Sequence, residues 1–281
     1  MKKSTKIWLV IATCLLLAVG IFFGGVMTML KWDFTKLSTA KYETNKHEIT
    51  EAFNSITIRT NTSDVKILPT EGNKCEIVCI EKANLKHTVT TENGELKIIL
   101  NDTRRWYEHI DISFGKTEIT AYIPKTLYES VTVVNSTGRI NIEELCASTL
   151  SLSLTTGKVT ASKVNCNGSF NLKQSTGDTF LSDVNCQSFN SEGTTGSITL
   201  KNVIASDKIS IERSTGNIKF DLCDATQIEV ETDTGSITGT FLTDKIFFAE
   251  TETGKIDIPK SITGGLCEVE TDTGDIILNI K

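Results

Sequence analysis

Apolar and polar residues alternate through most of the chain after residue 52, which is the pattern of half-buried β-strands. From residue 131 the alternation repeats in step with a Thr-Gly dipeptide that recurs every 19 or 20 residues. Apolar columns stand seven and five residues before each glycine, and two and four residues after it. A helix would need a period of 3.6, which these columns do not show. The pattern therefore predicts an all-β fold, a single-stranded β-solenoid (β-helix) whose rungs bury their apolar edges against one another.

Eight glycines mark the corner of each predicted rung: Gly138, Gly157, Gly177, Gly196, Gly216, Gly235, Gly254 and Gly274. We expect these glycines to adopt a positive φ, which a β-carbon would disfavour. That structural role accounts for the repeat without a ligand. Four positions depart from the apolar columns, and the rungs that carry them are expected to be underpacked: Thr179, Ser191, Gly239 and Ala249.

The predicted solenoid spans residues 52–281 and has two parts. Residues 52–130 contain irregularly spaced strand patterns, one of them at 110–114, and are interpreted as degenerate N-terminal rungs. Residues 131–281 contain eight regular rungs, which we expect to stack in chain order. No polar cap follows the last rung at Gly274. Either the final residues close that end, or it contacts another molecule, including a second copy of the chain.

An uncharged apolar run of 24 residues, Ile7 to Leu30, is long enough to cross a bilayer core of ~30 Å as a helix. Lysines precede the run within residues 1–6, and the positive-inside rule then predicts a single-pass cell-membrane protein. Its N-terminus would be a short cytoplasmic tail without a signalling domain, and its C-terminal domain would be extracellular. Residues 31–51 are expected to be a juxtamembrane linker. A cleaved signal peptide remains an alternative, and Gly20 and Gly24 have the spacing of a helix-dimer face.

Charge and cysteine usage exclude some classes of function. The net charge is -6, so the basic footprint of a nucleic-acid-binding protein is absent. Three of the eight cysteines recur at one repeat interval and are interpreted as small apolar core residues: Cys146, Cys166 and Cys186. Cys75 and Cys79 lie ~13 Å apart on one strand, too far for a disulfide. Stacked rungs place sulfurs in a column and not in a tetrahedron, so neither a metal site nor a cofactor is predicted.

Catalytic signatures are also absent from the sequence. The three histidines, His47, His87 and His109, lie outside the regular repeats, and no zinc-protease, nucleophile-elbow or phosphate-loop motif occurs. We therefore expect the protein not to be an enzyme.

Two acidic columns are the strongest candidate chemistry. Four residues before the glycine, five consecutive rungs carry glutamate: Glu192, Glu212, Glu231, Glu250 and Glu270. Two residues before the glycine, three rungs carry a second column: Asp233, Glu252 and Asp272. One interpretation is a solvated face that discourages aggregation. The other is a surface for divalent cations or a cationic polymer, because hard cations take several carboxylate oxygens.

The chain resembles the DUF4097 family, whose members are often labelled adhesins. The resemblance rests on Ile56-Thr-Ile58, Asp64-Val65-Lys-Ile67, the segment from Ile119 to Pro124, and the Thr-Gly-x-Ile turns from Gly138 onward. It covers about residues 53–281. It implies a bacterial, commonly membrane-anchored β-solenoid of the cell envelope, and it brings no catalytic residues.

These observations predict a non-catalytic cell-envelope ectodomain, an adhesin-like or scaffold surface anchored by a single membrane span. Its partner would be a surface polymer or an envelope protein. The alternative is an accessory protein for envelope-stress sensing or regulation, which would act through the membrane helices of a partner.

Overall fold

A computed structural model describes residues 3–37, 40–102, 104 and 115–281, and the strand predicted at 110–114 lies outside these residues. The chain divides into two compact units. The first unit holds helix α1 (Lys3–Met29) and the short 3₁₀ helix η1 (Phe34–Leu37). Within residues 5–29 of α1 an 18-residue stretch has a mean hydropathy of 2.6, and this helix has the length and composition of a membrane span or a signal sequence. Its two glycines of interest, Gly20 and Gly24, have open space around them.

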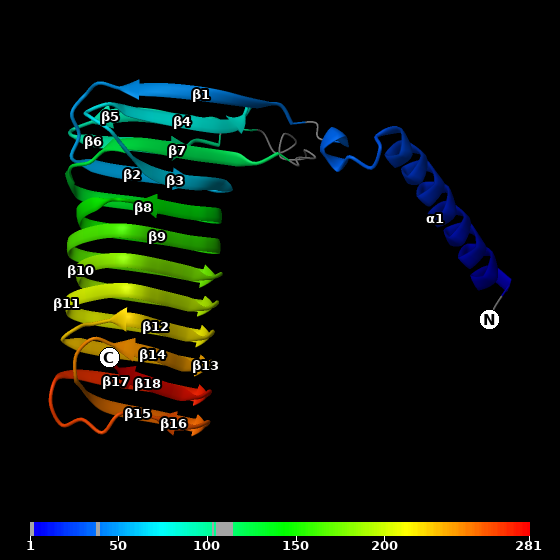
Figure 1. Ribbon diagram of the computed structural model, residues 1–281. Coiled ribbons are helices and arrows are strands. Elements are labelled where there is room, and N and C mark those ends of the chain that lie inside the picture. Colours follow the sequence, from blue (N-terminus) through cyan, green and yellow to red (C-terminus); the bar gives the residue numbers. More distant parts are fainter. Residues whose placement is uncertain (1–2, 38–39, 103, 105–114) are drawn as a thin grey trace. The chain divides into compact units, whose positions relative to one another are not determined.

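The second unit is an all-β solenoid, shown as the stacked arrows of Figure 1. Its first strands are β1 (Tyr42–Ile49), β2 (Ser55–Thr60), β3 (Ser63–Thr70), β4 (Cys75–Lys82), β5 (His87–Glu92), β6 (Glu95–Leu100) and β7 (Thr117–Pro124). Four long strands follow: β8 (Leu127–Glu143), β9 (Cys146–Thr176), β10 (Thr179–Thr195) and β11 (Ile198–Thr215). The last are β12 (Ile218–Cys223), β13 (Gln227–Thr234), β14 (Ile237–Phe241), β15 (Lys245–Thr253), β16 (Ile256–Asp257), β17 (Gly265–Thr273) and β18 (Ile276–Ile280).

Each regular rung runs into a Thr-Gly corner along one sheet and leaves it along another. Parallel pairing keeps equivalent residues in register from rung to rung, as in the alignment of Phe170 with Phe189 and of Val159 with Thr179. The interior between the sheets is a continuous core built from the inward-facing columns. A second turn follows six residues after the glycine, where non-glycine residues adopt positive φ: Glu144, Lys163, Asp183, Asn202 and Leu222.

Seven of the eight corner glycines have positive φ, between +130° and +156°. A β-carbon at Gly157 would overlap the carbonyl oxygen of Gly138 on the preceding rung, and the same overlap with a neighbouring corner recurs at the corner glycines that follow Gly157 in the sequence. These glycines therefore do more than permit a turn: they let the backbones of successive corners approach closely.

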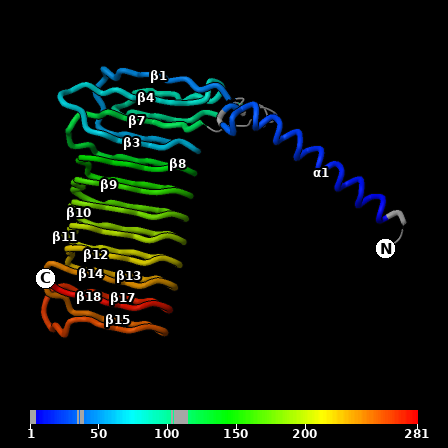
Figure 2. Tube along the Cα trace, turned by 45° about the vertical axis from the view of Figure 1, so that its right-hand side comes forward, coloured from blue at the N-terminus to red at the C-terminus, as the bar shows by residue number. Residues whose placement is uncertain are grey.

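The rungs do not stack in chain order at the C-terminal end, and the sequence-based expectation is wrong there. Strand β17 pairs with β13 on one side and with β15 on the other, and β18 lies in the same way between β14 and β16. The rung of Gly274 is therefore inserted between the rungs of Gly235 and Gly254. Figure 2 shows β15 beyond β17 and β18 at this end of the stack. The edge of the solenoid is formed by β15 and β16, so the rung of Gly274 is not the open last rung.

The N-terminal end departs from chain order in a similar way. Strands β2 and β3 pair directly with β8, although strands β4 to β7 lie between β3 and β8 in the sequence. On their other side β2 pairs with β6, and β3 with β7. Two antiparallel pairings, β5 with β6 and β4 with β7, complete this end, and β1 pairs with β4. The expected linker at 31–51 thus contributes β1, a strand of the solenoid, and 52–130 does not form rungs in simple succession.

Engineered disulfides test the inserted rung. Thr273 is in register with Thr234 on one neighbour and Thr253 on the other, and all three are exposed. Neighbouring rungs lie ~4.8 Å apart, within the range that a disulfide spans, whereas alternate rungs lie ~9.6 Å apart, beyond it. We expect Thr234→Cys with Thr273→Cys, and Thr273→Cys with Thr253→Cys, to cross-link on mild oxidation. Peptide mass spectrometry without reduction detects the link.

The pair Thr234→Cys with Thr253→Cys is the matched control and should stay reduced. Stacking in chain order gives the opposite pattern, with this control pair linked and the Thr234–Thr273 pair free.

The polar residues in the apolar columns are accommodated by hydrogen bonds. Thr179 is buried and its hydroxyl donates to Gln174 Oε1 at 2.5 Å. Ser191 is buried and accepts a hydrogen bond from Arg213 Nη2 at 3.2 Å. A β-carbon at Gly239 would meet the backbone of Phe220, so that position is also closely packed. The expected underpacking is therefore wrong at these three sites, and Ala249 is half-buried on the edge strand β15.

Candidate functional site

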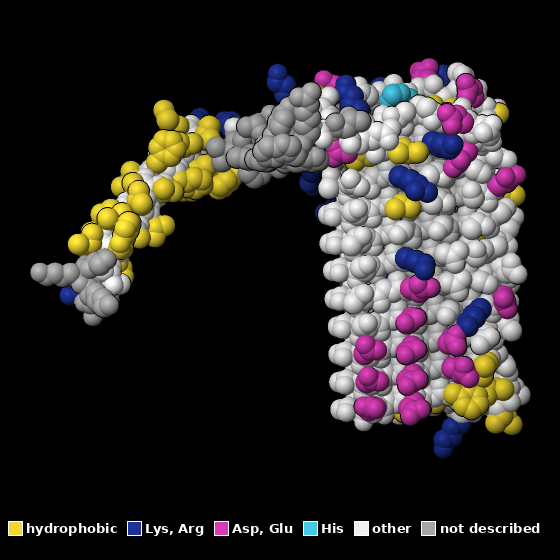
Figure 3. All heavy atoms as spheres, turned by 180° about the vertical axis from the view of Figure 1, so that it is seen from behind, with side chains coloured by type: hydrophobic (Ala, Val, Ile, Leu, Met, Phe, Trp, Pro, Cys, Tyr) yellow, Lys and Arg dark blue, Asp and Glu magenta, His cyan; other side chains and the backbone are white. Residues whose placement is uncertain are grey.

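The acidic columns lie on the outer face of the sheet that precedes the glycine corners. In β13 the residues on either side of Glu231, Val230 and Thr232, are buried in the core, so strand alternation turns Glu231 outward. The same alternation applies to Glu270 between Val269 and Thr271 on β17. Counting from the glycine thus predicted the face, and Figure 3 shows the carboxylates as two straight rows over the last rungs.

The inserted rung changes the order of the carboxylates in each column. Pairing places them in the spatial order Glu192, Glu212, Glu231, Glu270 and Glu250. The second column has the matching order Asp233, Asp272 and Glu252, which follows from the same strand pairs. A groove of about 420 Å³ lies over the rungs of 229–231, 268–270 and 248–250. The face is therefore continuous across β13, β17 and β15.

These carboxylates have few compensating charges. Glu192 pairs with Lys173 at 2.9 Å. Within the described part of the chain no ion pair involves the other seven: Glu212, Glu231, Glu270, Glu250, Asp233, Asp272 and Glu252. The pKa of Glu231 is raised, first by desolvation among its neighbours and then by the surrounding negative charges of Glu212, Glu270, Asp233 and Asp272. Like charges at rung spacing oppose one another, so a bound cation would relieve this repulsion.

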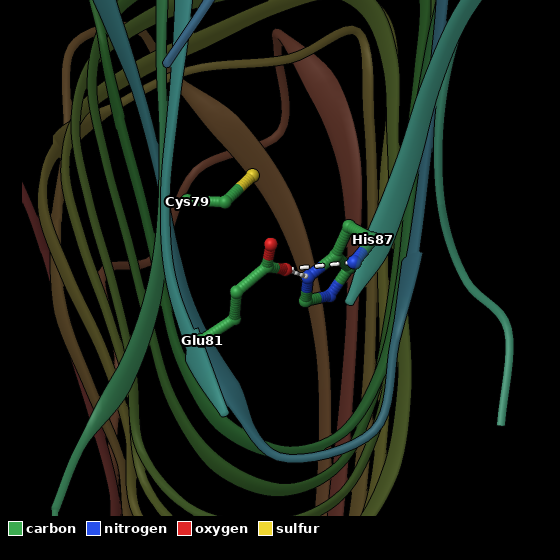
Figure 4. Close-up of side chains that lie close together, drawn as sticks. All are labelled: Cys79, Glu81 and His87. Carbon is green, nitrogen blue, oxygen red and sulfur yellow. Dashed lines mark hydrogen bonds and ion pairs between the residues drawn. The ribbon is translucent and has the colours of Figure 1, made fainter. Parts of the chain in front are cut away.

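A second cluster lies inside the N-terminal end of the solenoid and was not predicted from the sequence. Cys79, Glu81 and His87 bring one sulfur, one carboxylate oxygen and one ring nitrogen within 4.8 Å of one another. Figure 4 shows the Glu81 carboxylate directed at the imidazole, with the Cys79 sulfur beside it. All three residues are buried, with exposed fractions of 0%, 1% and 6%.

Hydrogen bonds fix the orientation of the carboxylate and of the imidazole in this cluster. Glu81 Oε2 accepts from the backbone N–H of His87 at 2.7 Å and lies 2.7 Å from its Nδ1. Glu81 Oε1 accepts from Asn45 Nδ2, also at 2.7 Å. The other ring nitrogen, Nε2, is 2.9 Å from the hydroxyl of Thr60. Burial, and secondarily the charge of Glu81, raises the pKa of the Cys79 thiol to about 12.

One signal in the sequence marks this cluster. In β4 the inward positions are Cys75, Ile77, Cys79 and Glu81, so a carboxylate stands where strand alternation requires an apolar residue. A buried charge is costly unless it is paired, and this predicts a partner for Glu81. The partner, His87, opens the next strand, β5.

The other cysteines give no comparable site among the described residues. Cys166 and Cys186 are buried and adjacent in register, as expected for core residues, whereas Cys146 is only half-buried. Both thiols of the adjacent pair remain free.

Comparison with solved structures finds similar chains at low identity. A structure named "putative adhesin" from Bacteroides fragilis is 15% identical with a TM-score of 0.55, and the alignment covers 85% of this chain and 97% of that one. A "putative lipid binding protein" from Parabacteroides distasonis is 12% identical with a TM-score of 0.41, covering 87% and 98% of the two chains. No curated protein matches the chain.

The family model described as Toastrack DUF4097 matches residues 53–207, more than half of the chain and a stretch that runs from β2 into β11. The match includes strands β2, β3 and β7, whose residues carried the resemblance, and the first Thr-Gly corners. The chain therefore belongs to the Toastrack DUF4097 family.

Proposed function

We propose that this protein is a non-catalytic, adhesin-like surface of the cell envelope that binds its partner through the two acidic columns. The observation that carries this proposal is a set of seven exposed carboxylates on consecutive rungs, with no ion pair to any of them among the described residues. A rigid ladder spaced at ~4.8 Å can contact several cationic groups at once, and such multivalent binding adds weak individual contacts together. A cationic envelope polymer would suit these carboxylates as a partner, and so would an anionic polymer bridged to them by divalent cations.

The N-terminal helix supports the location. Residues 5–29 suit a membrane anchor, and the lysines at 2, 3 and 6 favour a cytoplasmic N-terminus with the solenoid outside. A related structure named as an adhesin is consistent with a surface role. Helix α1 would then tether the solenoid, and the acidic face would make the contact.

The buried cluster supports a non-catalytic role. Thr60, His87 and Glu81 form a hydrogen-bonded chain like that of a nucleophile, base and orienting acid. The Thr60 side chain is a core residue, however, with an exposed fraction of 5% for the whole residue. A nucleophile must meet its substrate, so a hydroxyl enclosed in the solenoid is poorly placed for catalysis.

Co-sedimentation with purified cell-wall material tests the acidic face, using the full-length protein in nanodiscs with and without millimolar calcium. We expect the wild type to pellet and the variant Glu231→Gln, Glu250→Gln, Glu270→Gln to bind about tenfold more weakly. Three surface charge contacts at about 0.5 kcal/mol each give that factor. Salt at about 1 M should weaken wild-type binding, because the screening length falls to ~3 Å.

The control variant Glu48→Gln, Glu51→Gln, Glu129→Gln removes the same charge from exposed positions near the other end of the solenoid. It should bind as the wild type does. Equal losses in both variants, or no wall binding by the wild type, would contradict the proposal. In a separate pull-down of the tagged full-length protein from its native membrane, recovery of a stoichiometric membrane regulator in place of wall material would favour the sensory alternative.

A further inference from the structure

We propose that Cys79, Glu81 and His87 form a binding site for a divalent transition-metal ion, most suitably Zn²⁺, inside the N-terminal end of the solenoid. The three side chains present their ligand atoms within 4.8 Å of one another (Figure 4). Small side-chain rotations would bring them to the ~2.0–2.3 Å distances of zinc ligation. The site is separate from the acidic face and does not depend on it.

The donor set determines the kind of ion. A thiolate is a soft ligand, a carboxylate a hard one, and an imidazole lies between them. Zinc accepts all three in a tetrahedral geometry, whereas calcium and magnesium take oxygen ligands. A water molecule would complete the fourth position.

The surrounding hydrogen bonds suit the ligated state as well as the metal-free one. The Thr60 hydroxyl oxygen, 2.9 Å from Nε2 of His87, can accept a hydrogen bond from an Nε2–H. This tautomer leaves the lone pair of Nδ1 free on the side that faces Glu81 and Cys79. Asn45 holds Oε1 of Glu81, so Oε2 remains for the metal. Such outer contacts orient ligands in known metal sites.

Charge also favours the ligated state. Zinc binds cysteine as the thiolate, so ligation by Cys79 would release the thiol proton to solvent. One thiolate and one carboxylate then balance the two charges of the ion, so a neutral complex is buried. The ion would also give the buried Glu81 carboxylate a counter-charge, in addition to its hydrogen bonds from Asn45 and the backbone of His87.

The position of the site gives it a structural role. Cys79 and Glu81 belong to β4 and His87 belongs to β5, while Thr60 ends β2. At this end of the stack β4 pairs in antiparallel fashion with β7, and β5 does so with β6. A metal would therefore link strands that are joined by the turn at 83–86. End rungs lack one neighbour, and a metal link would stabilise this closure.

Cobalt substitution tests the site in the full-length, detergent-solubilised protein, kept reduced and stripped with a chelator. We expect one equivalent of Co²⁺ to give a thiolate-to-cobalt absorption band and visible bands of tetrahedral cobalt, and one equivalent of Zn²⁺ to abolish them. Cys79→Ser should remove the thiolate band and weaken Zn²⁺ binding at least a hundredfold. Thr60→Val should weaken it ten- to a hundredfold, as expected for a second-layer contact.

Cys75→Ser is the matched control, because Cys75 is a buried cysteine on the same inward side of β4. It should retain the full cobalt spectrum. The proposal would be overturned by a wild-type protein that binds no stoichiometric Zn²⁺ or Co²⁺ at a metal concentration of about 10 μM. This outcome counts even if Cys79→Ser fails to fold. A thiolate band that persists in Cys79→Ser and disappears in Cys75→Ser would also overturn the proposal.

Discussion

Gly157→Ala should destabilise the solenoid by about 4 kcal/mol, which is a large effect for the addition of one methyl group. Gly157 has φ +143°, a conformation that side chains rarely adopt, and this strain accounts for about 1–3 kcal/mol. The new β-carbon would also overlap the carbonyl oxygen of Gly138. Backbone cannot rotate away as a side chain can, so adjacent rungs must separate and lose hydrogen bonds. Urea denaturation followed by circular dichroism measures the change.

Gly72→Ala separates the two causes. Gly72 also has positive φ, +83°, but nothing lies within 4 Å of the position that its β-carbon would occupy. Only the backbone strain applies there, so we expect a cost of about 1 kcal/mol. Equal costs at Gly72 and Gly157 would show that close stacking of the corners contributes nothing. A Gly157→Ala variant as stable as the wild type would contradict the packing of the corners itself.

The regular part of the fold was predictable because its determinants are local. Period-two alternation identifies the inward side chains, and the Thr-Gly dipeptide places each corner. The acidic face follows from the same counting, since Glu231 must point outward when Val230 and Thr232 point inward. These inferences need no knowledge of which rung lies next to which.

The order of the rungs was not predictable, because these local determinants are nearly the same in every rung. The segments that end in Gly235, Gly254 and Gly274 share an acidic Thr-Gly corner and an isoleucine two residues later. Each segment can pair with either of the others, because parallel pairing depends on backbone hydrogen bonds and on the side chains of each column, and both repeat from rung to rung. The spacings of 19 and 20 residues between these glycines equal those elsewhere, so chain length gave no sign of an inserted rung.

The buried cluster was missed because it depends on contacts between irregular strands. Cys79 and His87 are separated by a turn whose geometry the sequence does not specify, and Thr60 comes from a more distant strand. Only Glu81, at an inward position, marked the site locally. An inward carboxylate predicts that a polar partner is present, but only the fold identifies that partner.

Ile276→Ala should cost about 3–4 kcal/mol, the range for a fully buried isoleucine whose removal leaves a cavity. Ile276 is in register with Ile237 on one side and Ile256 on the other, and its exposed fraction is 0%. The C-terminal rung is therefore interior, although it ends the chain. Urea denaturation of the full-length protein measures the loss of stability.

Ile256→Ala is the matched comparison, with the same residue type in the same column on the adjacent rung. Ile256 is 41% exposed on the edge strand β16, so its truncation should cost less than about 1 kcal/mol. Stacking in chain order reverses the ranking, because Ile256 would then be interior and Ile276 would lie at the edge. The difference between the two variants thus reports which rung closes the solenoid, and a larger cost at Ile256 would refute the inserted rung.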